Sequence, residues 1–165
     1  MAENEILYSI DEYCCIFRLL GNIRHTNSTG FNATIRKLFD ENQINDVIID
    51  LRETIFIDST NLGLLAIISR NLWQINKKRP VVLCPQNDVY EILISMDFQN
   101  YFTIMTDDEI EFEKMDAVST VDENSKAQII LEAHEALINL SESNRLQFEN
   151  LIDLLRIELG TDELV

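Results

Sequence analysis

The sequence predicts an α/β domain followed by a helical extension. Up to about residue 105, short runs rich in β-branched and aromatic residues alternate with stretches in which apolar residues recur every three or four positions. That alternation is typical of strands and helices packed in layers. Residues 127–165 show helical spacing only. With 165 residues, 46% of them hydrophobic, the chain is long enough to bury a core of its own.

The amino-terminal third predicts a hairpin, a helix and a central strand. Ile6–Ile10 and Tyr13–Leu20 are strand-like runs separated by Asp11 and Glu12, which predicts two strands joined by a tight turn. After a polar loop, apolar residues recur at helical spacing at Phe31, Ile35, Leu38 and Phe39. Val47–Ile49 is a continuous apolar run of the kind found in buried central strands.

A long helix is predicted at Ser59–Asn76. It ends in the basic cluster Lys77–Arg79, which suits the negative end of a helix dipole, and Pro80 follows. Three shorter elements come next: a strand at Val81–Cys84, a helix that opens near Asn87 or Asp88 and reaches Met96, and a last strand at Phe102–Met105.

The remaining chain divides into a linker and a tail. Residues 106–126 are acidic, and their apolar pattern fades, as at a strand edge that runs into a linker. Two helical stripes follow, Ile129–Leu140 and Phe148–Leu159, with capping residues between them at Ser141–Asn144. We therefore expect a domain at 1–116, a linker at 117–126 and a helical hairpin at 127–165. One long helix is the alternative for the tail.

Composition excludes several classes of function. A formal net charge of -16 makes nucleic acid and anionic membranes improbable partners, because phosphate groups repel such a surface. No stretch is long enough to span a bilayer, and the first residues are acidic rather than basic as in a signal peptide, so we expect a cytoplasmic protein. The three cysteines lack metal-ligand spacing, and the acidic run lacks that of a calcium loop. We predict no metal and no cofactor.

The candidate site lies where the predicted strand at Val47–Leu51 leads to the long helix. Ser59 opens that helix, where backbone N–H groups lack partners and the dipole is positive, so an oxyanion or a phosphate is tolerated there. The simplest reading of Asp58 or Ser59 is a helix N-cap. Asn61 can adopt a left-handed turn conformation, and Gly63 lets another backbone come close.

Residues 49–51 and 57–65 together resemble the signature of the STAS domain, the fold of bacterial anti-sigma factor antagonists. The resemblance extends from about Ile6 to Met105 and implies a small mixed sheet flanked by helices, here with the C-terminal hairpin added. In that family the serine directly after the aspartate is phosphorylated, which corresponds to Ser59. The family usually has glycine where this chain has Asn61, and because asparagine reaches the same conformation we expect the turn to be kept.

The resemblance also implies a mechanism and partners. When Ser59 is unphosphorylated, the turn binds an anti-sigma factor or a regulatory serine protein kinase, and phosphorylation releases that partner. A phosphatase of the PP2C type, either free or within a response regulator, reverses the switch. We expect the partner-binding residues to be those of the turn: Asp58, Ser59, Thr60, Asn61, Leu62 and Gly63. The tail is similar to that of proteobacterial STAS proteins that work with such response regulators. Because the helix after Ser59 is apolar nearly all round, we expect the tail to pack on it.

Three alternatives remain. A STAS module can serve as a scaffold or a ligand sensor without a sigma-factor circuit. A hydrolase would use Ser59 with His25 or His134 as base and Asp58 as orienting acid, but Gly-x-Ser-x-Gly is absent and neither histidine has a sequence reason to lie near Ser59. We therefore predict that the protein is not an enzyme. His134 as a phosphotransfer residue is also disfavoured against an exposed or interface histidine.

Overall fold

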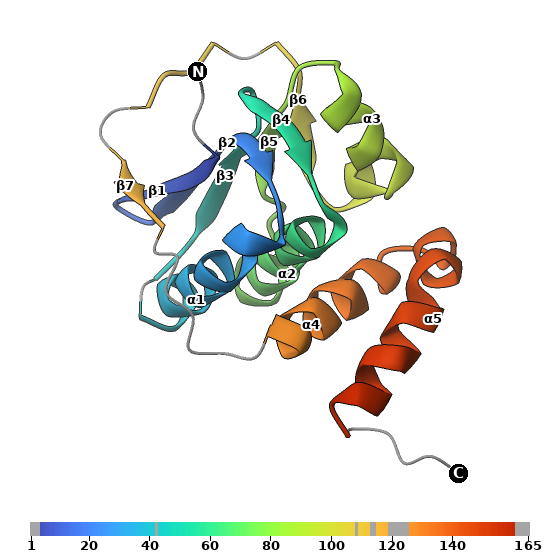
Figure 1. Ribbon diagram of the computed structural model, residues 1–165. Helices are drawn as coiled ribbons and strands as arrows, with labels where there is room; N and C mark the ends of the chain where they lie inside the picture. Colours follow the sequence, from blue (N-terminus) through green and yellow to red (C-terminus); the bar gives the residue numbers. More distant parts are fainter. Residues whose placement is uncertain (1–3, 42, 108, 113–114, 119–125, 161–165) are drawn as a thin grey trace.

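The computed structural model describes residues 4–41, 43–107, 109–112, 115–118 and 126–160. A seven-stranded mixed sheet forms the centre, with the path β6-β5-β3-β2-β1-β7 and with β4 paired to β2 off that path (Figure 1). The strands are β1 (Glu5–Asp11), β2 (Cys14–Ile23), β3 (Asp46–Asp50), β4 (Thr54–Ile57), β5 (Val81–Leu83), β6 (Thr103–Met105) and β7 (Asp116–Ala117).

Strand direction follows from the connections. The β1–β2 hairpin is antiparallel and turns at Glu12, whose φ of 55° places it in the left-handed region. β2, β3, β5 and β6 run parallel because helices connect them in crossovers. The short strand β7 pairs antiparallel with the outer side of β1. The buried central strand predicted at Val47–Ile49 is confirmed as β3.

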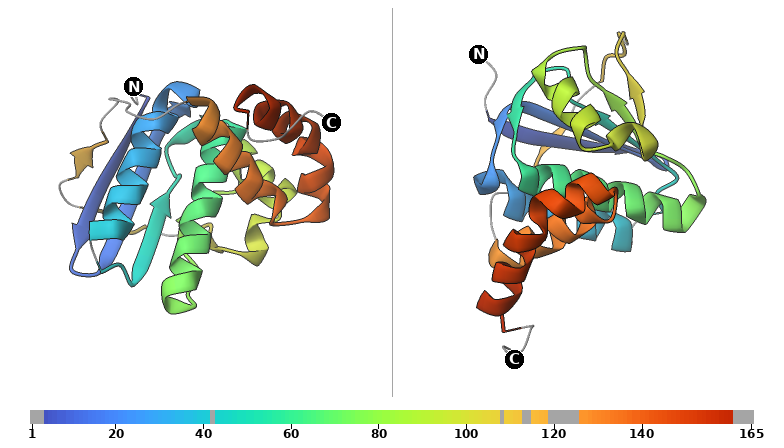
Figure 2. Two further views of the ribbon diagram at one scale, coloured as in Figure 1. Left: turned by 90° about the horizontal axis from the view of Figure 1, so that it is seen from below. Right: turned by 90° about the vertical axis from the view of Figure 1, so that its right-hand side faces the viewer.

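Helices cover the sheet and extend away from it. They are α1 (His25–Glu41), α2 (Ser59–Asn76), α3 (Asp88–Ser95), the 3-10 turn η1 (Phe98–Asn100), α4 (Lys126–Ile138) and α5 (Glu142–Glu158). α1 and α2 lie side by side on one face, and α3 packs against β4 and η1. α4 packs on α2, and α5 packs on α4 further from the sheet (Figure 2). The tail is a helical hairpin rather than one long helix, and the expectation that it packs on the helix after Ser59 is confirmed for α4.

Two predictions need correction. The segment before Phe31 is not a loop but the first turns of α1. Its polar residue Ser28 can be buried in the helix because its hydroxyl donates a hydrogen bond to the His25 carbonyl at 2.6 Å. Residues 54–57, which were expected only as a connection, form β4. Much of the predicted linker lies outside the described residues, although Ala117 at its start belongs to β7 and Lys126 at its end opens α4.

Candidate functional site

Asp58 follows β4 directly and caps α2. Its extended backbone (φ -81°, ψ 170°) leaves the carboxylate free to accept from the Asn61 backbone N–H at 2.9 Å. The Asp58 N–H donates to the Ile23 carbonyl at 3.0 Å, which ties the cap to the end of β2. Ser59 is therefore the first residue of the helix, as predicted, and Asp58 is the N-cap.

Asn61 does not adopt the left-handed conformation that the sequence suggested. It lies in the first turn of α2 with an ordinary helical backbone and is fully buried. Its side-chain amide donates to the Arg24 carbonyl at 2.9 Å and to the Asp58 carboxylate at 2.8 Å. Asn61 thus joins the α2 cap to the segment before α1, so its role is tertiary rather than a backbone turn.

The Ser59 hydroxyl meets a histidine from the tail. Ser59 Oγ lies 3.0 Å from His134 Nε2, and His134 Nδ1 lies 2.7 Å from the Ile130 carbonyl oxygen one turn earlier in α4. A carbonyl oxygen only accepts, so Nδ1 carries the proton and Nε2 is the acceptor. The Ser59 hydroxyl therefore donates to His134.

Burial keeps this imidazole neutral. His134 is 2% exposed, and its ring packs edge-on against Phe148 of α5 with centroids 5.1 Å apart. Burial lowers the pKa of His134, and the hydrogen bond to Ile130 and the charge of Asp58 offset part of that effect. Of the two positions expected for His134, exposed or in an interface, the structure shows the second: the ring is buried between α2 and α5.

The predicted partner-binding residues lie together at the start of α2 but differ in their exposure to solvent. Asp58 and Ser59 are partly exposed, whereas Thr60, Asn61, Leu62 and Gly63 are buried. The backbone that approaches Gly63 belongs to α4: a Cβ at position 63 would lie 2.2 Å from the Ala133 carbonyl oxygen. The tail therefore covers part of the turn that we expected to face a partner.

An exposed apolar patch beside Ser59 was missed from sequence. Ile55 and Phe56 of β4 are 66% and 37% exposed, and the Arg24 guanidinium lies over the Phe56 ring at 5.0 Å from its centroid. We call these three residues the β4 patch. Strand alternation does not predict this pattern, because Thr54 and Ile57 are buried while the adjacent residues Ile55 and Phe56 are both exposed. The pairing with β2 shifts register at this point, and that irregularity is visible only in the folded structure.

The Ser59–His134 pair has the contact of a nucleophile and its base, although no sequence pattern predicted that the two residues lie close together. His25, the other candidate base, opens α1 and makes no described contact with Ser59. A backbone carbonyl, not Asp58, orients His134, and Asp58 is committed to Asn61. Of the two cavities found, one lies between α2 and the tail and the other near Met105, and Ser59 lines neither of them. Neither of these two cavities therefore places a substrate next to the pair.

The family model for the STAS domain matches residues 5–110, which is more than half of the chain. The chain belongs to the STAS family. The match ends before α4, so the helix that reaches Ser59 lies outside the matched region.

Solved STAS structures share the fold of this domain. The anti-sigma factor antagonist SpoIIAA in its unphosphorylated form is 20% identical, with a TM-score of 0.52, over 66% of this chain and 91% of the other. The Bacillus cell fate determinant SpoIIAA in the phosphorylated form is 18% identical, with a TM-score of 0.53, over 66% and 93%. No curated protein matches the sequence.

None of the described helices has the length and apolar character needed to cross a membrane. Among the described histidine, cysteine and acidic side chains, no group of three is placed to hold a metal ion.

Proposed function

We propose that this STAS protein is an anti-sigma factor antagonist whose binding to a protein partner is switched by phosphorylation of Ser59. The partner is an anti-sigma factor or a regulatory serine kinase, and a phosphatase of the PP2C type restores the binding form. The observation that carries the proposal is the position of Ser59: it is the first residue of α2, capped by Asp58, partly exposed, and adjacent to the β4 patch.

The β4 patch supplies what a docking surface requires. Exposed apolar and aromatic side chains next to an arginine are enriched at the centres of interfaces. Ile55, Phe56 and Arg24 provide these groups beside the hydroxyl that carries the switch. Of the turn itself, Asp58 and Ser59 face a partner directly, and the buried residues from Thr60 to Gly63 hold the turn in place.

A phosphate on Ser59 opposes docking without unfolding the domain. The group adds about -1.5 to -2 charges at pH 7, and the free N–H groups at the start of α2 tolerate it. In a closed interface an unpartnered charge costs about 3 to 5 kcal/mol. Partner binding then weakens by about two to three and a half orders of magnitude.

The test begins with phosphopeptide mass spectrometry on the protein purified from its native cells under phosphatase inhibition. We expect phosphate on Ser59 at a level that varies with growth state. Dephosphorylated and phosphorylated protein then serve as baits for partner capture, and the dephosphorylated bait is expected to retain a sigma-factor regulator. Absence of phosphate on Ser59 in every growth state contradicts the switch.

A matched pair of variants tests the β4 patch. Phe56→Ala removes an exposed aromatic ring beside Ser59, and Ile75→Ala removes a comparably exposed apolar side chain near the other end of α2. We expect capture of the partner to fall about tenfold or more with Phe56→Ala and to be unchanged with Ile75→Ala. Equal effects would show that the partner does not dock at this patch.

A scaffold or ligand sensor of the STAS type is the alternative function. If the dephosphorylated and the phosphorylated bait retain the same partner equally well, the protein is a scaffold or sensor and not a phosphorylation switch. The enzyme reading is tested separately, since a serine-reactive fluorophosphonate labels Ser59 only if His134 activates it as a nucleophile. We expect no labelling, because Ser59 lines neither of the cavities described.

A further inference from the structure

The tail meets the STAS domain at the switch residue itself, across a distance of 75 positions in the sequence. Ser59 Oγ donates to His134 Nε2 at 3.0 Å, and His134 is 2% exposed at the centre of the α2–α4 contact. Ala133, the residue before it, packs directly on Gly63, where no side chain larger than hydrogen fits. The region of the tail nearest to α2 is therefore the region that binds Ser59.

We propose that α4 is a cover over α2, latched through the Ser59 hydroxyl, and that phosphorylation of Ser59 unlatches it. The proposal deepens the proposed function, because it names a second consequence of the same modification. The occupant of the α2 face is α4 of this chain. When the cover leaves, the face that contains Leu62, Gly63 and Ala66 becomes accessible.

The chemistry of phosphorylation removes the latch. Transfer of the γ-phosphoryl group from ATP to Oγ replaces the O–H bond with an O–P bond and releases ADP and the proton. Ser59 Oγ then has no hydrogen to donate, and in the dianionic form that predominates at pH 7 the Nε2 lone pair faces phosphate oxygens that only accept. A proton on His134 would restore a bond: the negative phosphate favours the imidazolium, whereas burial of the ring opposes it. Release of α4 is the outcome in which burial prevails. The buried acceptor is left unpaired, which favours opening.

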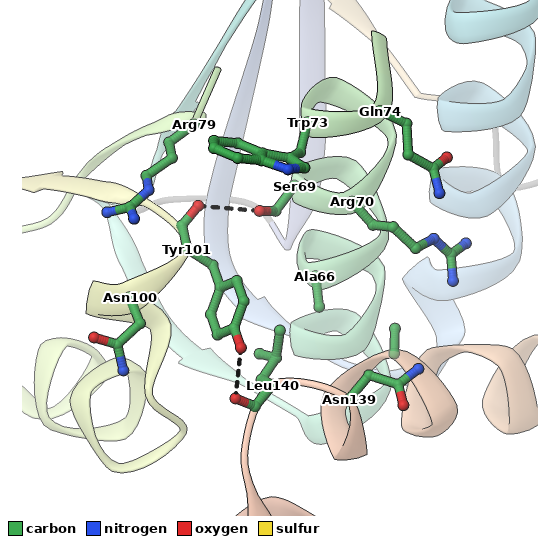
Figure 3. Close-up of a pocket in the computed structure, with 11 residues that line it drawn as sticks. Ala66, Ser69, Arg70, Trp73, Gln74, Arg79, Asn100, Tyr101, Asn139 and Leu140 are labelled. Carbon is green, nitrogen blue, oxygen red and sulfur yellow. Dashed lines mark hydrogen bonds between the residues drawn. The ribbon is translucent and has the colours of Figure 1, made fainter. Parts of the chain in front are cut away.

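The turn between α4 and α5 is anchored to the domain independently of Ser59, through Tyr101 and Met96, so α4 can open without loss of the whole hairpin. The Tyr101 hydroxyl donates to the Leu140 carbonyl at 2.7 Å beside a cavity of about 450 Å³ between α2 and the tail (Figure 3). Asn144, fully buried in the first turn of α5, donates to the Met96 and Leu137 carbonyls at 3.0 Å. These bonds hold the α4–α5 turn while α4 leaves Ser59.

Hydrogen exchange of the full chain tests the latch without any partner or kinase. In Ser59→Ala the hydroxyl is lost, and we expect amides of α4 to exchange about ten times faster or more. Ser59→Thr keeps a hydroxyl and should exchange like wild type. Ser69→Ala is the matched control, because Ser69 is buried on the same helix but donates to the Tyr101 carbonyl instead. Amides of the central strand β3 serve as the internal reference, because α1 itself contacts α4 through the Arg36–Glu132 ion pair.

Two further variants separate the latch from general packing. His134→Leu keeps an apolar side chain against Phe148 but cannot accept from Ser59, and it should speed α4 exchange as Ser59→Ala does. His134→Gln retains an acceptor oxygen and should restore much of the protection. If α4 exchanges at the wild-type rate in both Ser59→Ala and His134→Leu, packing alone holds the tail and the latch is wrong, while the phosphorylation switch on partner binding still stands.

The phosphorylated form decides the direction of the effect. Phosphoserine placed at position 59 by an expanded genetic code gives homogeneously phosphorylated protein. In this protein we expect the amide hydrogens of α4, and those in the first turns of α2, to exchange faster than in the unphosphorylated chain. Unchanged exchange in α4 would overturn the release. Slower exchange would overturn it too, because it would mean that the phosphate binds the tail through a protonated His134. Loss of partner binding with no change in α4 supports the switch and contradicts the cover.

Discussion

At the scale of single residues, the site depends on the side-chain hydrogen bonds of Asn61. Asn61 donates from its side-chain amide to the Arg24 carbonyl and to the Asp58 carboxylate, while its side-chain oxygen Oδ1 is buried without a partner among the described residues. An unpaired buried polar atom is costly, so the two donated bonds are what Asn61 contributes: they tie the segment between β2 and α1 to the α2 cap and so position Ser59.

The first prediction concerns this tie. Asn61→Ala leaves the Arg24 carbonyl without its donor, and we expect a loss of about 1 to 3 kcal/mol in the free energy of unfolding. Asn71→Ala is the control, because Asn71 lies on the same helix and makes no side-chain hydrogen bond within the described chain. Urea denaturation measures both. Equal losses would mean that the tie is not a special feature of the site.

The second prediction concerns pH. The pKa of His134 is lowered in the folded state, so the unfolded chain binds more protons near pH 6, and stability falls as pH drops through the unfolded value near 6.5. Asp58 is the charged group that faces the ring, and its charge reduces the effect. Between pH 7.5 and 5.5 wild type should lose up to about 1.4 kcal/mol more than His134→Gln. Identical pH profiles in urea denaturation would show that His134 does not titrate on unfolding.

At the scale of elements, the contact between α2 and α4 depends on one glycine. Helices approach this closely only where a side chain is absent, and at position 63 a Cβ would lie within 2.2 to 2.7 Å of three backbone atoms of Ala133. Backbone cannot yield as the end of a flexible side chain can. The α4 helix must therefore shift if position 63 gains a methyl group.

The third prediction follows from that contact. Gly63→Ala should lower the free energy of unfolding by about 1 to 3 kcal/mol through overpacking. Helix propensity alone predicts the opposite sign, since alanine is favoured over glycine in a helix by about 1 kcal/mol. Urea denaturation gives the sign, and hydrogen exchange should place the loss of protection in α4. A stabilised variant would contradict the close approach of α4.

At the scale of the whole molecule, the tail completes the burial of α2. Eleven residues of α2 are buried, from Thr60 to Ser69 and Leu72, although only one side of a helix can face the sheet. α4 covers the remaining apolar surface, and α5 in turn covers α4 with Phe148 and Ile152. The tail is therefore part of the hydrophobic core.

The fourth prediction is that deletion of residues 126–165 exposes α2. Amides of Leu64–Ile75 should exchange faster in the shortened chain, and the newly exposed apolar surface should promote self-association. Hydrogen exchange and sedimentation measure the two effects. Unchanged exchange across Leu64–Ile75 would contradict the packing of the tail on this helix.

Local patterns in the sequence determined much of this protein, whereas contacts between distant residues came only from the tertiary structure. The order of strands and helices and the place of Ser59 follow from hydrophobic spacing and from capping by Asp58, because both depend on neighbours within one helical turn. The role of Asn61 and the meeting of Ser59 with His134 depend on how α1 and α4 pack against α2. Side chains 75 positions apart leave no local signal of their contact, so only the folded arrangement reveals that the switch serine binds the tail.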